Sequence, residues 1–262
     1  MDTLTTVTGK KYDEAFFKNP DPALQKQLDA EGILVLEEFV SPEALTLLKK
    51  EAALLKPGAY RSESVYNLFV MPEDASLPED SPRNRQFKTT KGCIADDEVP
   101  KNSALRTIYD SPLFREFICK LEGLPEIFPY ADALSSININ YYDEGDSLEW
   151  HFDNADFAIT LLLKQCDEGG VYEYVPNVRY TKDGKEDYDA LANILDGKTK
   201  PLTADMPEGT LMLFRGNRSV HRVTPITKGD RVLVTLNYNV KPGIPLSEKS
   251  RKTFFGRIGV RT

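Results

Sequence analysis

The sequence predicts a mainly β protein with supporting helices, folded as a single domain over residues 1–262. Strand-like runs dominate from Ser135 onward, whereas helix-start signals and one short β-rich run occupy the first third of the chain. The length also fits one elaborated barrel or sandwich, because all-β domains commonly reach about 200–250 residues. We expect helical support with a lid in residues 1–134, a β core in 135–240 and a C-terminal extension in 241–262.

Proline and small polar residues mark where the supporting helices begin. A helix that starts at Pro22 should end before Gly32, and the apolar run 33–36 that follows is predicted to be a strand. Two further helices start at Ser-Pro pairs, at residues 41–42 and 111–112, because serine caps a helix N-terminus and proline fits the first turn. In the first of these two helices, the leucines at 45, 47, 48, 54 and 55 should form the face that packs on the β core.

Two polar segments interrupt the regular pattern. Residues 72–103 are Pro-rich and lack periodicity, which predicts a long loop of the kind that often serves as a lid. Residues 180–200 form a charged insertion, in which 186–195 is predicted to be a short helix closed by Gly197. The insertion is either a surface connection or a cover over the site, and the sequence leaves the roles of both segments open.

The chain contains only two histidines, and their positions indicate a metal centre. His151 opens the motif His-Phe-Asp, so in a strand its imidazole and the Asp153 carboxylate face the same side. His221 lies far downstream and can come from a second strand. Two histidines and one carboxylate on one face of an octahedron leave three open positions, as in non-haem Fe(II) oxygenases.

An arginine follows the second histidine at a distance of ten residues. Arg231 begins a strand-like run, and its guanidinium could grip a carboxylate through two parallel hydrogen bonds. Further candidate contacts for such a ligand lie on two strand faces: Thr235 and Asn237 beside Arg231, and Asn140 and Tyr142 before a turn at Gly145.

Taken together, these motifs resemble the iron(II)/2-oxoglutarate-dependent dioxygenase superfamily. The shared features are Tyr-x-x-Gly, His-x-Asp, Gly169-Gly170 with Tyr174, Pro207-x-Gly209 leading to Phe214, His221 and Arg231. The likeness covers residues 135–240 and is specific, because separate motifs agree in order and spacing. It implies a double-stranded β-helix, or cupin-like jelly roll. In that fold His151, Asp153 and His221 would bind Fe(II), Arg231 would anchor 2-oxoglutarate, and O₂ would be the second co-substrate.

A closer resemblance is to the branch of free amino-acid hydroxylases and lysine halogenases, carried by residues 150–153 and 169–179. That branch acts on small molecules. Its halogenating members have Gly or Ala in place of the carboxylate ligand, whereas this chain keeps Asp153. The resemblance therefore implies hydroxylation of an unactivated C–H bond, most simply in a free amino acid, with release of succinate and CO₂.

Other functions stay open at this point. Residues 140–153 also resemble the nucleic-acid demethylase branch, and a peptidyl oxygenase, a desaturase or a cyclase could use the same chemistry. A metal-binding scaffold without activity is a further alternative. The formal net charge of −8 and the absence of a long Lys/Arg run argue against a nucleic-acid partner.

Substrate contacts and location are weakly marked. Arg83 and Arg85 could pair with a substrate carboxylate, and Asn154 and Asp156 could meet an amine; a solvated surface is the alternative for each. No apolar run approaches the ~18 residues of a membrane span, and the N-terminus lacks signal-peptide features. We expect a cytoplasmic enzyme with a small-molecule substrate and no membrane partner. The substrate, the carbon attacked and the choice between monomer and homodimer are left open.

Overall fold

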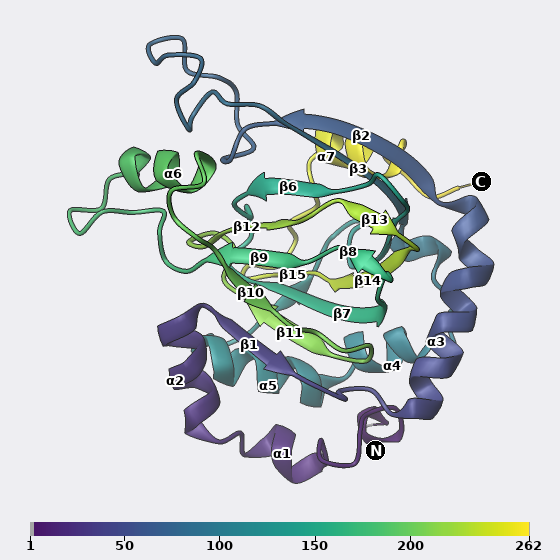
Figure 1. Ribbon diagram of the computed structural model, residues 1–262. Coiled ribbons are helices and arrows are strands. Elements are labelled where there is room, and N and C mark those ends of the chain that lie inside the picture. The colour runs from purple at the N-terminus through teal and green to yellow at the C-terminus, as the bar shows by residue number, and fades with distance from the viewer. Residues whose placement is uncertain (1–2, 262) are drawn as a thin grey trace.

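The computed structural model describes residues 3–261, in which two antiparallel sheets face each other and helices surround the larger sheet (Figure 1). The larger sheet has seven strands, in the spatial order β1 (Ile33–Leu36), β11 (Leu211–Phe214), β7 (Ala158–Lys164), β14 (Arg231–Leu236), β5 (Ile137–Tyr142), β3 (Phe87–Ile94) and β2 (Tyr60–Tyr66). Both of its edge strands, β1 and β2, come from the first quarter of the chain.

The smaller sheet carries the first histidine motif and the second histidine. It contains, in spatial order, β10 (Leu202–Ala204), β9 (Tyr172–Val175), β12 (Val220–Val223) and β6 (Leu148–His151). Two short ribbons complete the β structure: β8 (Glu168–Gly169) with β13 (Ile226–Lys228), and β4 (Phe128–Pro129) with β15 (Tyr238–Asn239). The predicted mainly β jelly roll is confirmed.

The helices lie mostly before the jelly-roll strands in sequence. They are α1 (Glu14–Lys18), α2 (Pro22–Glu31), α3 (Pro42–Leu55), α4 (Ala104–Tyr109), α5 (Pro112–Glu122), α6 (Tyr188–Leu195) and α7 (Glu248–Phe255), with 3₁₀ turns η1 (Leu4–Thr6), η2 (Lys56–Gly58) and η3 (Asp96–Glu98). Within residues 3–261, none of the helices combines the length and the apolar composition that crossing a bilayer requires.

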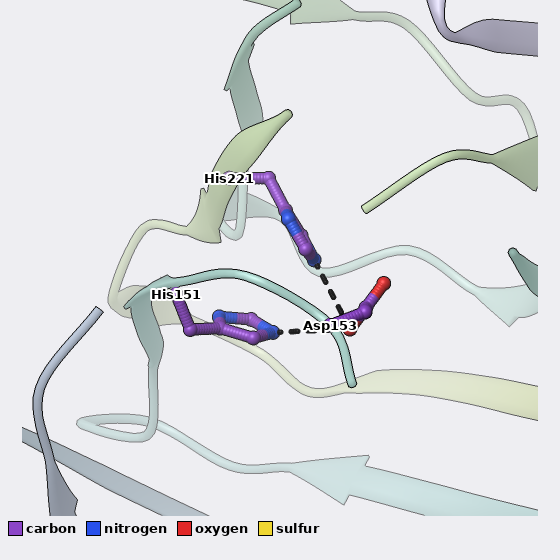
Figure 2. A group of neighbouring side chains, drawn as sticks. All are labelled: His151, Asp153 and His221. Carbon is purple, nitrogen blue, oxygen red and sulfur yellow. Dashed lines mark ion pairs between the residues drawn. The ribbon is translucent and has the colours of Figure 1, made fainter. Parts of the chain in front are cut away.

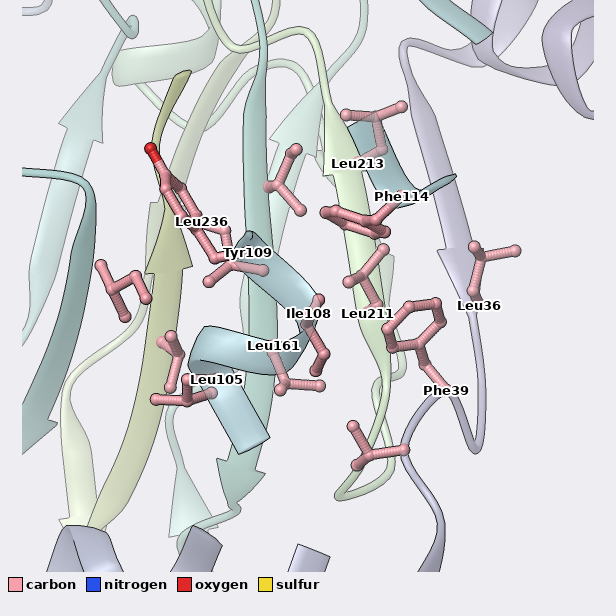
Figure 3. Packing of buried hydrophobic residues seen from close by; sticks show 14 of the residues in the cluster. Leu36, Phe39, Leu105, Ile108, Tyr109, Phe114, Leu161, Leu211, Leu213 and Leu236 are labelled. Atoms are coloured by element: carbon pink, nitrogen blue, oxygen red, sulfur yellow. The ribbon is translucent and has the colours of Figure 1, made fainter. Parts of the chain in front are cut away.

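Two separate apolar cores stabilise the larger sheet, one on each face. On the outer face, Ile108 of α4 and Phe114 of α5 are buried against Leu161 and Leu211 of the sheet (Figure 3). On the inner face, a second cluster between the sheets includes Tyr142, Leu162, Tyr172, Phe214 and Leu233. Because side chains alternate along a strand, one sheet can serve both cores.

The predicted helix starts are confirmed, and of the five leucines predicted to form the packing face of α3, Leu45, Leu48 and Leu55 pack on the core whereas the other two do not. Ser41 Oγ accepts a hydrogen bond from Ala44 N at 3.1 Å, as expected for an N-cap residue. The buried positions are Ala44, Leu48 and Ala52, whereas Leu47 is 63 % exposed and Leu54 is 83 % exposed. Residues spaced by four lie on one helix face, and the two exposed leucines lie outside that face.

The prediction of a continuous loop over residues 72–103 is wrong. Its second half contains β3, which pairs with β2 on one side and with β5 on the other. Lys88, Lys91 and Gly92 interrupt the apolar pattern of β3, so its strand character was not visible in the sequence. The first half of the predicted loop belongs to the irregular segment between β2 and β3, residues 67–86, which projects from the sheets (Figure 1).

The charged insertion contains the predicted short helix. In α6, Asp187 Oδ1 accepts a hydrogen bond from Ala190 N at 3.0 Å and so caps the helix. Leu191 and Ile194 of this helix belong to the same buried cluster as Phe152, which stands between the two metal-binding candidates of the His-Phe-Asp motif. The insertion therefore packs directly behind the candidate site.

Candidate metal centre

Two neighbouring strands bring the histidines together. His151 ends β6, His221 lies in β12, and the two residues are direct partners in the antiparallel register. Asp153 follows β6 by two residues, and its backbone N–H donates to Gly216 O at 3.0 Å. Each side chain offers one ligand atom, and these three atoms all lie within 4.8 Å of one another. The three side chains point toward a common centre (Figure 2).

Backbone carbonyls fix the orientation of both imidazole rings. His151 Nδ1 lies 2.7 Å from Glu149 O, and His221 Nδ1 lies 3.1 Å from Ser219 O. A carbonyl oxygen can accept a hydrogen bond but cannot donate one. In a neutral ring, Nδ1 therefore carries the hydrogen and Nε2 keeps its lone pair. Both Nε2 atoms face Asp153 Oδ1, at 3.6 Å from His151 and 3.7 Å from His221.

The charges of the cluster suit a divalent cation. Burial, together with the neighbouring His151, lowers the pKa of His221 to about 4, so the ring is neutral at pH 7. Burial opposes the ionisation of Asp153, but His221 and His151 hold its pKa below the ordinary value. Within residues 3–261, Asp153 Oδ2 is buried without a hydrogen-bond partner. Two neutral nitrogens and one carboxylate are the donor set of non-haem Fe(II) sites.

Gly216 leaves the space that the Asp153 carboxylate occupies. A Cβ atom at position 216 would lie 1.9 Å from Asp153 Oδ2, 2.6 Å from its Cγ and 2.9 Å from His221 Cε1. Any side chain at this position would therefore collide with the carboxylate.

Arg231 is a buried cation whose guanidinium keeps two donors without partners. It begins β14, is 1 % exposed and lies opposite Tyr142 in the register of the sheet. In the part of the chain that the structure describes, Arg231 Nε and Nη1 and the Tyr172 hydroxyl are buried without hydrogen-bond partners. The Tyr172 ring lies 5.7 Å from the His221 ring, and Arg231 acts on the pKa of Tyr172 against the effect of burial, so Tyr172 is near both the arginine and the histidine cluster. A guanidinium with two free donors suits a bidentate carboxylate.

The other residues predicted to contact 2-oxoglutarate have different surroundings. Asn140 Oδ1 accepts a hydrogen bond from Lys91 Nζ at 2.8 Å. Thr235 shares the face of Arg231 but lies about 13 Å further along the strand, at about 3.3 Å per residue. Asn237 lies beyond β14, and its amide donates to Ser135 O at 2.7 Å, which fastens β14 to the start of β5. The structure therefore does not bring Asn237 to Arg231.

A polar cavity of about 380 Å³ opens beside the cluster. It is lined by Asp153, Asn154, Arg179, Tyr180, Asn217 and Arg218. Arg179 is held over the Phe152 ring, 5.0 Å from its centre, donates to Asn217 O at 3.1 Å and forms an ion pair with Glu186 at 3.3 Å. The cavity therefore presents cationic and amide groups next to a metal-ligand candidate.

Of the four predicted substrate residues, the structure places only Asn154 in this cavity. Arg85 pairs with Asp196 at 3.0 Å and so fastens the 67–86 loop to the end of α6. Arg83 lies over the Phe69 ring at 5.4 Å, and Asp156 is exposed outside the cavity lining. Their side chains are therefore committed elsewhere or solvated.

Several residues of the site were not predicted. Arg179 stood at the end of the stretch that carried the closer resemblance, and Gly216 and Asn217 lie just before His221, so their positions offered a signal. The sequence offered no signal for Lys91, because the segment around it was predicted to be a loop. Tyr172 lies two residues before Tyr174, the aromatic residue of the predicted motif, so the spacing of a strand could have indicated it.

Solved structures share this fold at low sequence identity. An oxidoreductase of the 2OG-Fe(II) oxygenase family from Burkholderia pseudomallei is 14 % identical, with a TM-score of 0.53 over 85 % of this chain and 92 % of that chain. The 2-oxoglutarate-dependent carbocyclase SnoK from nogalamycin biosynthesis is 13 % identical, with a TM-score of 0.59 over 88 % and 95 %. A prolyl hydroxylase from Trichoplax adhaerens is 14 % identical, with a TM-score of 0.55 over 88 % and 94 %. These likenesses show that the chain shares the fold of 2OG-Fe(II) oxygenases, and the three ligand candidates lie together within that fold.

The family of the chain is shown by comparison of its sequence. Comparison with curated proteins gives no match. The family described as Halogenase D matches residues 18–253, which is nearly the whole chain. The chain belongs to the Halogenase D family.

Proposed function

We propose that this protein hydroxylates an unactivated C–H bond of a free amino acid, using Fe(II), 2-oxoglutarate and O₂. The observation that carries the proposal is the complete His151, Asp153 and His221 donor set beside the buried, unpartnered guanidinium of Arg231. The proposal includes a single catalytic domain acting on a small molecule in the cytoplasm.

The roles of the residues follow from their contacts. His151, Asp153 and His221 would hold the iron, and the carbonyls of Glu149 and Ser219 keep each ring turned with Nε2 toward it. Arg231 would bind the far carboxylate of 2-oxoglutarate, and because its side chain is buried, such an ion pair is little screened. When bound, the iron with 2-oxoglutarate and O₂ supplies the oxidation, releasing succinate and CO₂.

Selectivity for one carbon then depends on how the protein holds the substrate. Asn154, Arg179 and Asn217 present amide and guanidinium groups beside Asp153, which favours a small polar molecule over an apolar one. Accurate placement of the reacting bond is a large source of rate acceleration. No side-chain general base is needed for the reaction.

The retained carboxylate favours hydroxylation over halogenation. In halogenating relatives of this branch Gly or Ala stands at this position, which opens a metal site for chloride. Here Asp153 occupies that place, and Gly216 leaves room for its carboxylate. Halogenation is the second candidate, because the family is described as Halogenase D.

A screen of free amino acids tests the proposal. Purified protein should release succinate only when Fe(II), 2-oxoglutarate and O₂ are all present, and mass spectrometry should find a +16 product in equal amount. Asp153→Gly should lose hydroxylation and, at high chloride, gain at most traces of chlorination. Asp156→Gly, an exposed neighbour outside the cavity lining, is the matched control. A +16 product from a peptide or a nucleic acid, and from no amino acid, would reject the substrate assignment but not the iron site.

A further inference from the structure

Lys91 stands on the inner face of the larger sheet, level with Arg231. In the register of β3 and β5, Gly92 pairs with Tyr141, so Lys91 lies beside Tyr142 one step further along. On its other side, Tyr142 pairs with Arg231 of β14. Paired residues share one face of a sheet. Two cationic side chains therefore flank Tyr142 on three adjacent strands.

The face that carries Lys91 continues toward the histidine cluster. Thr89, two residues earlier on β3, shares this face and lies 2.7 Å from the Tyr66 hydroxyl. The Tyr66 ring in turn lies 6.1 Å from the ring of His151. Lys91 is thus connected to the candidate metal centre by one row of polar side chains.

The ammonium group of Lys91 has only neutral partners. Its Nζ donates to Asn140 Oδ1 at 2.8 Å and lies 5.4 Å from the centre of the Phe254 ring on α7. Among residues 3–261, no carboxylate forms an ion pair with Lys91, whereas Lys88 on the same strand pairs with Glu63 at 2.9 Å. Lys91 is half-buried, and an ammonium group that loses part of its hydration without gaining an anion destabilises the fold.

The electrostatics are consistent with this geometry. Burial lowers the pKa of Lys91, and the charges of Cys93 and Asp153 act in the opposite direction. A bound carboxylate would supply the missing counter-charge and a second acceptor for the ammonium hydrogens.

We propose that Lys91, supported by Asn140, is a second carboxylate anchor of the site, separate from Arg231, and that it binds the carboxylate of the substrate. The inference rests on the proposed function and deepens it. Arg231 already offers two free donors for the far carboxylate of 2-oxoglutarate. Arg179 of the polar cavity is already paired with Glu186 at 3.3 Å, so the carboxylate of an amino acid still needs a cationic partner. Phe254 brings the C-terminal helix α7 into the substrate site.

Two titrations on each variant test the anchor. Lys91→Met removes the charge at similar length, Lys91→Arg keeps the charge, and Lys88→Met removes an exposed lysine from the opposite face of the same strand. Each Ni(II)-loaded protein would be titrated by calorimetry with 2-oxoglutarate. Each would then be titrated, at saturating 2-oxoglutarate, with the free amino acids, their carboxamides and succinate. Melting temperatures establish that each variant is folded.

We expect Lys91→Met to bind 2-oxoglutarate like the unmodified protein and to bind the amino acid about 10–100-fold more weakly, the range for losing a charge-assisted hydrogen bond. The carboxamide should bind both proteins equally weakly. Lys91→Arg should recover much of the affinity, and Lys88→Met should not differ from the unmodified protein.

The outcomes separate the two possible sources of the carboxylate. A loss confined to 2-oxoglutarate would keep Lys91 as a carboxylate anchor but assign it to the co-substrate. Equal binding of every carboxylate by Lys91→Met and the unmodified protein would overturn the anchor. Failure of the proposed function is a different result, because it is seen in the unmodified protein as the absence of any oxidised amino acid.

Discussion

Replacing Gly216 with alanine is expected to displace the Asp153 carboxylate and weaken metal binding. The new Cβ would lie 1.9 Å from Asp153 Oδ2, so the oxygen must retreat by about 1.5 Å to reach ordinary contact at 3.4 Å. Metal–ligand distances are maintained to within about 0.2 Å, so a shift of this size removes the ligand. We expect the affinity for the metal to fall by at least about 10–100-fold, the loss that follows when a ligand's support is disturbed.

The assay is a titration with Co(II), whose absorption spectrum reports its coordination. Four proteins would be compared: the unmodified chain, Gly216→Ala, Asp153→Gly and the double variant. In the Asp153→Gly background the collision with the carboxylate is gone, and only the 2.9 Å contact with His221 Cε1 remains. Adding alanine there should therefore weaken Co(II) binding less than it does in the unmodified chain, and the difference between the two losses is the coupling energy between positions 216 and 153. Gly259→Ala, at a position with open space around it, is the control.

Two results would refute this reasoning. Unchanged Co(II) affinity in Gly216→Ala would mean that the carboxylate is not confined as the structure indicates. An equal loss of affinity in the presence and absence of Asp153 would mean that the alanine acts through the fold or through His221.

Three further predictions concern the site and its surroundings. His221→Ala should abolish iron retention, measured by elemental analysis, and an iron content equal to that of the unmodified protein would contradict the ligand assignment. Arg231→Ala should weaken 2-oxoglutarate binding by roughly 2–5 kcal/mol while Co(II) binding is unchanged, and an unaltered 2-oxoglutarate affinity would point to another anchor. Burial opposes the ionisation of Asp230, but its ion pairs with Lys164 and Lys56 hold the pKa below the ordinary value. Asp230 therefore stabilises the fold above about pH 4, and that contribution is lost as the pH falls through the folded-state pKa. Asp230→Asn should lower the free energy of unfolding in urea by about 0.2–1 kcal/mol at pH 7 and by less at pH 3, and a pH-independent difference would exclude this origin.

The parts of the site that the sequence predicted are those with local signals. His151 and Asp153 are two residues apart on an extended segment, so their shared face could be derived before any fold was known. Arg231 was found because it begins a strand-like run at a fixed distance from His221. The helices that begin at Ser41 and Ser111 were found in the same way, because N-caps are determined by neighbouring residues.

The parts that were missed depend on contacts between distant segments. Lys91 is part of the inner face only because β3 inserts between β2 and β5, and a strand with two lysines, a glycine and two threonines has no clear apolar alternation. The role of Gly216 depends on its contact with Asp153. Asp153 lies just after β6, more than 60 residues earlier in the sequence than Gly216. Asn237 shares a predicted face with Arg231, but periodicity does not show that β14 ends before it.

The order of strands in the larger sheet has a consequence for any attempt to shorten this protein. Residues that precede position 67 supply both of its outer strands, β1 and β2, and β3 follows before position 95. A fragment beginning at Ser135 would keep the metal ligands but leave β11 and β5 with unpaired backbone N–H and C=O groups. Exposed strands of this kind recruit other chains. The N-terminal third therefore protects the catalytic strands from self-association, and during synthesis β1 must wait for β11, nearly 180 residues later, before it can pair.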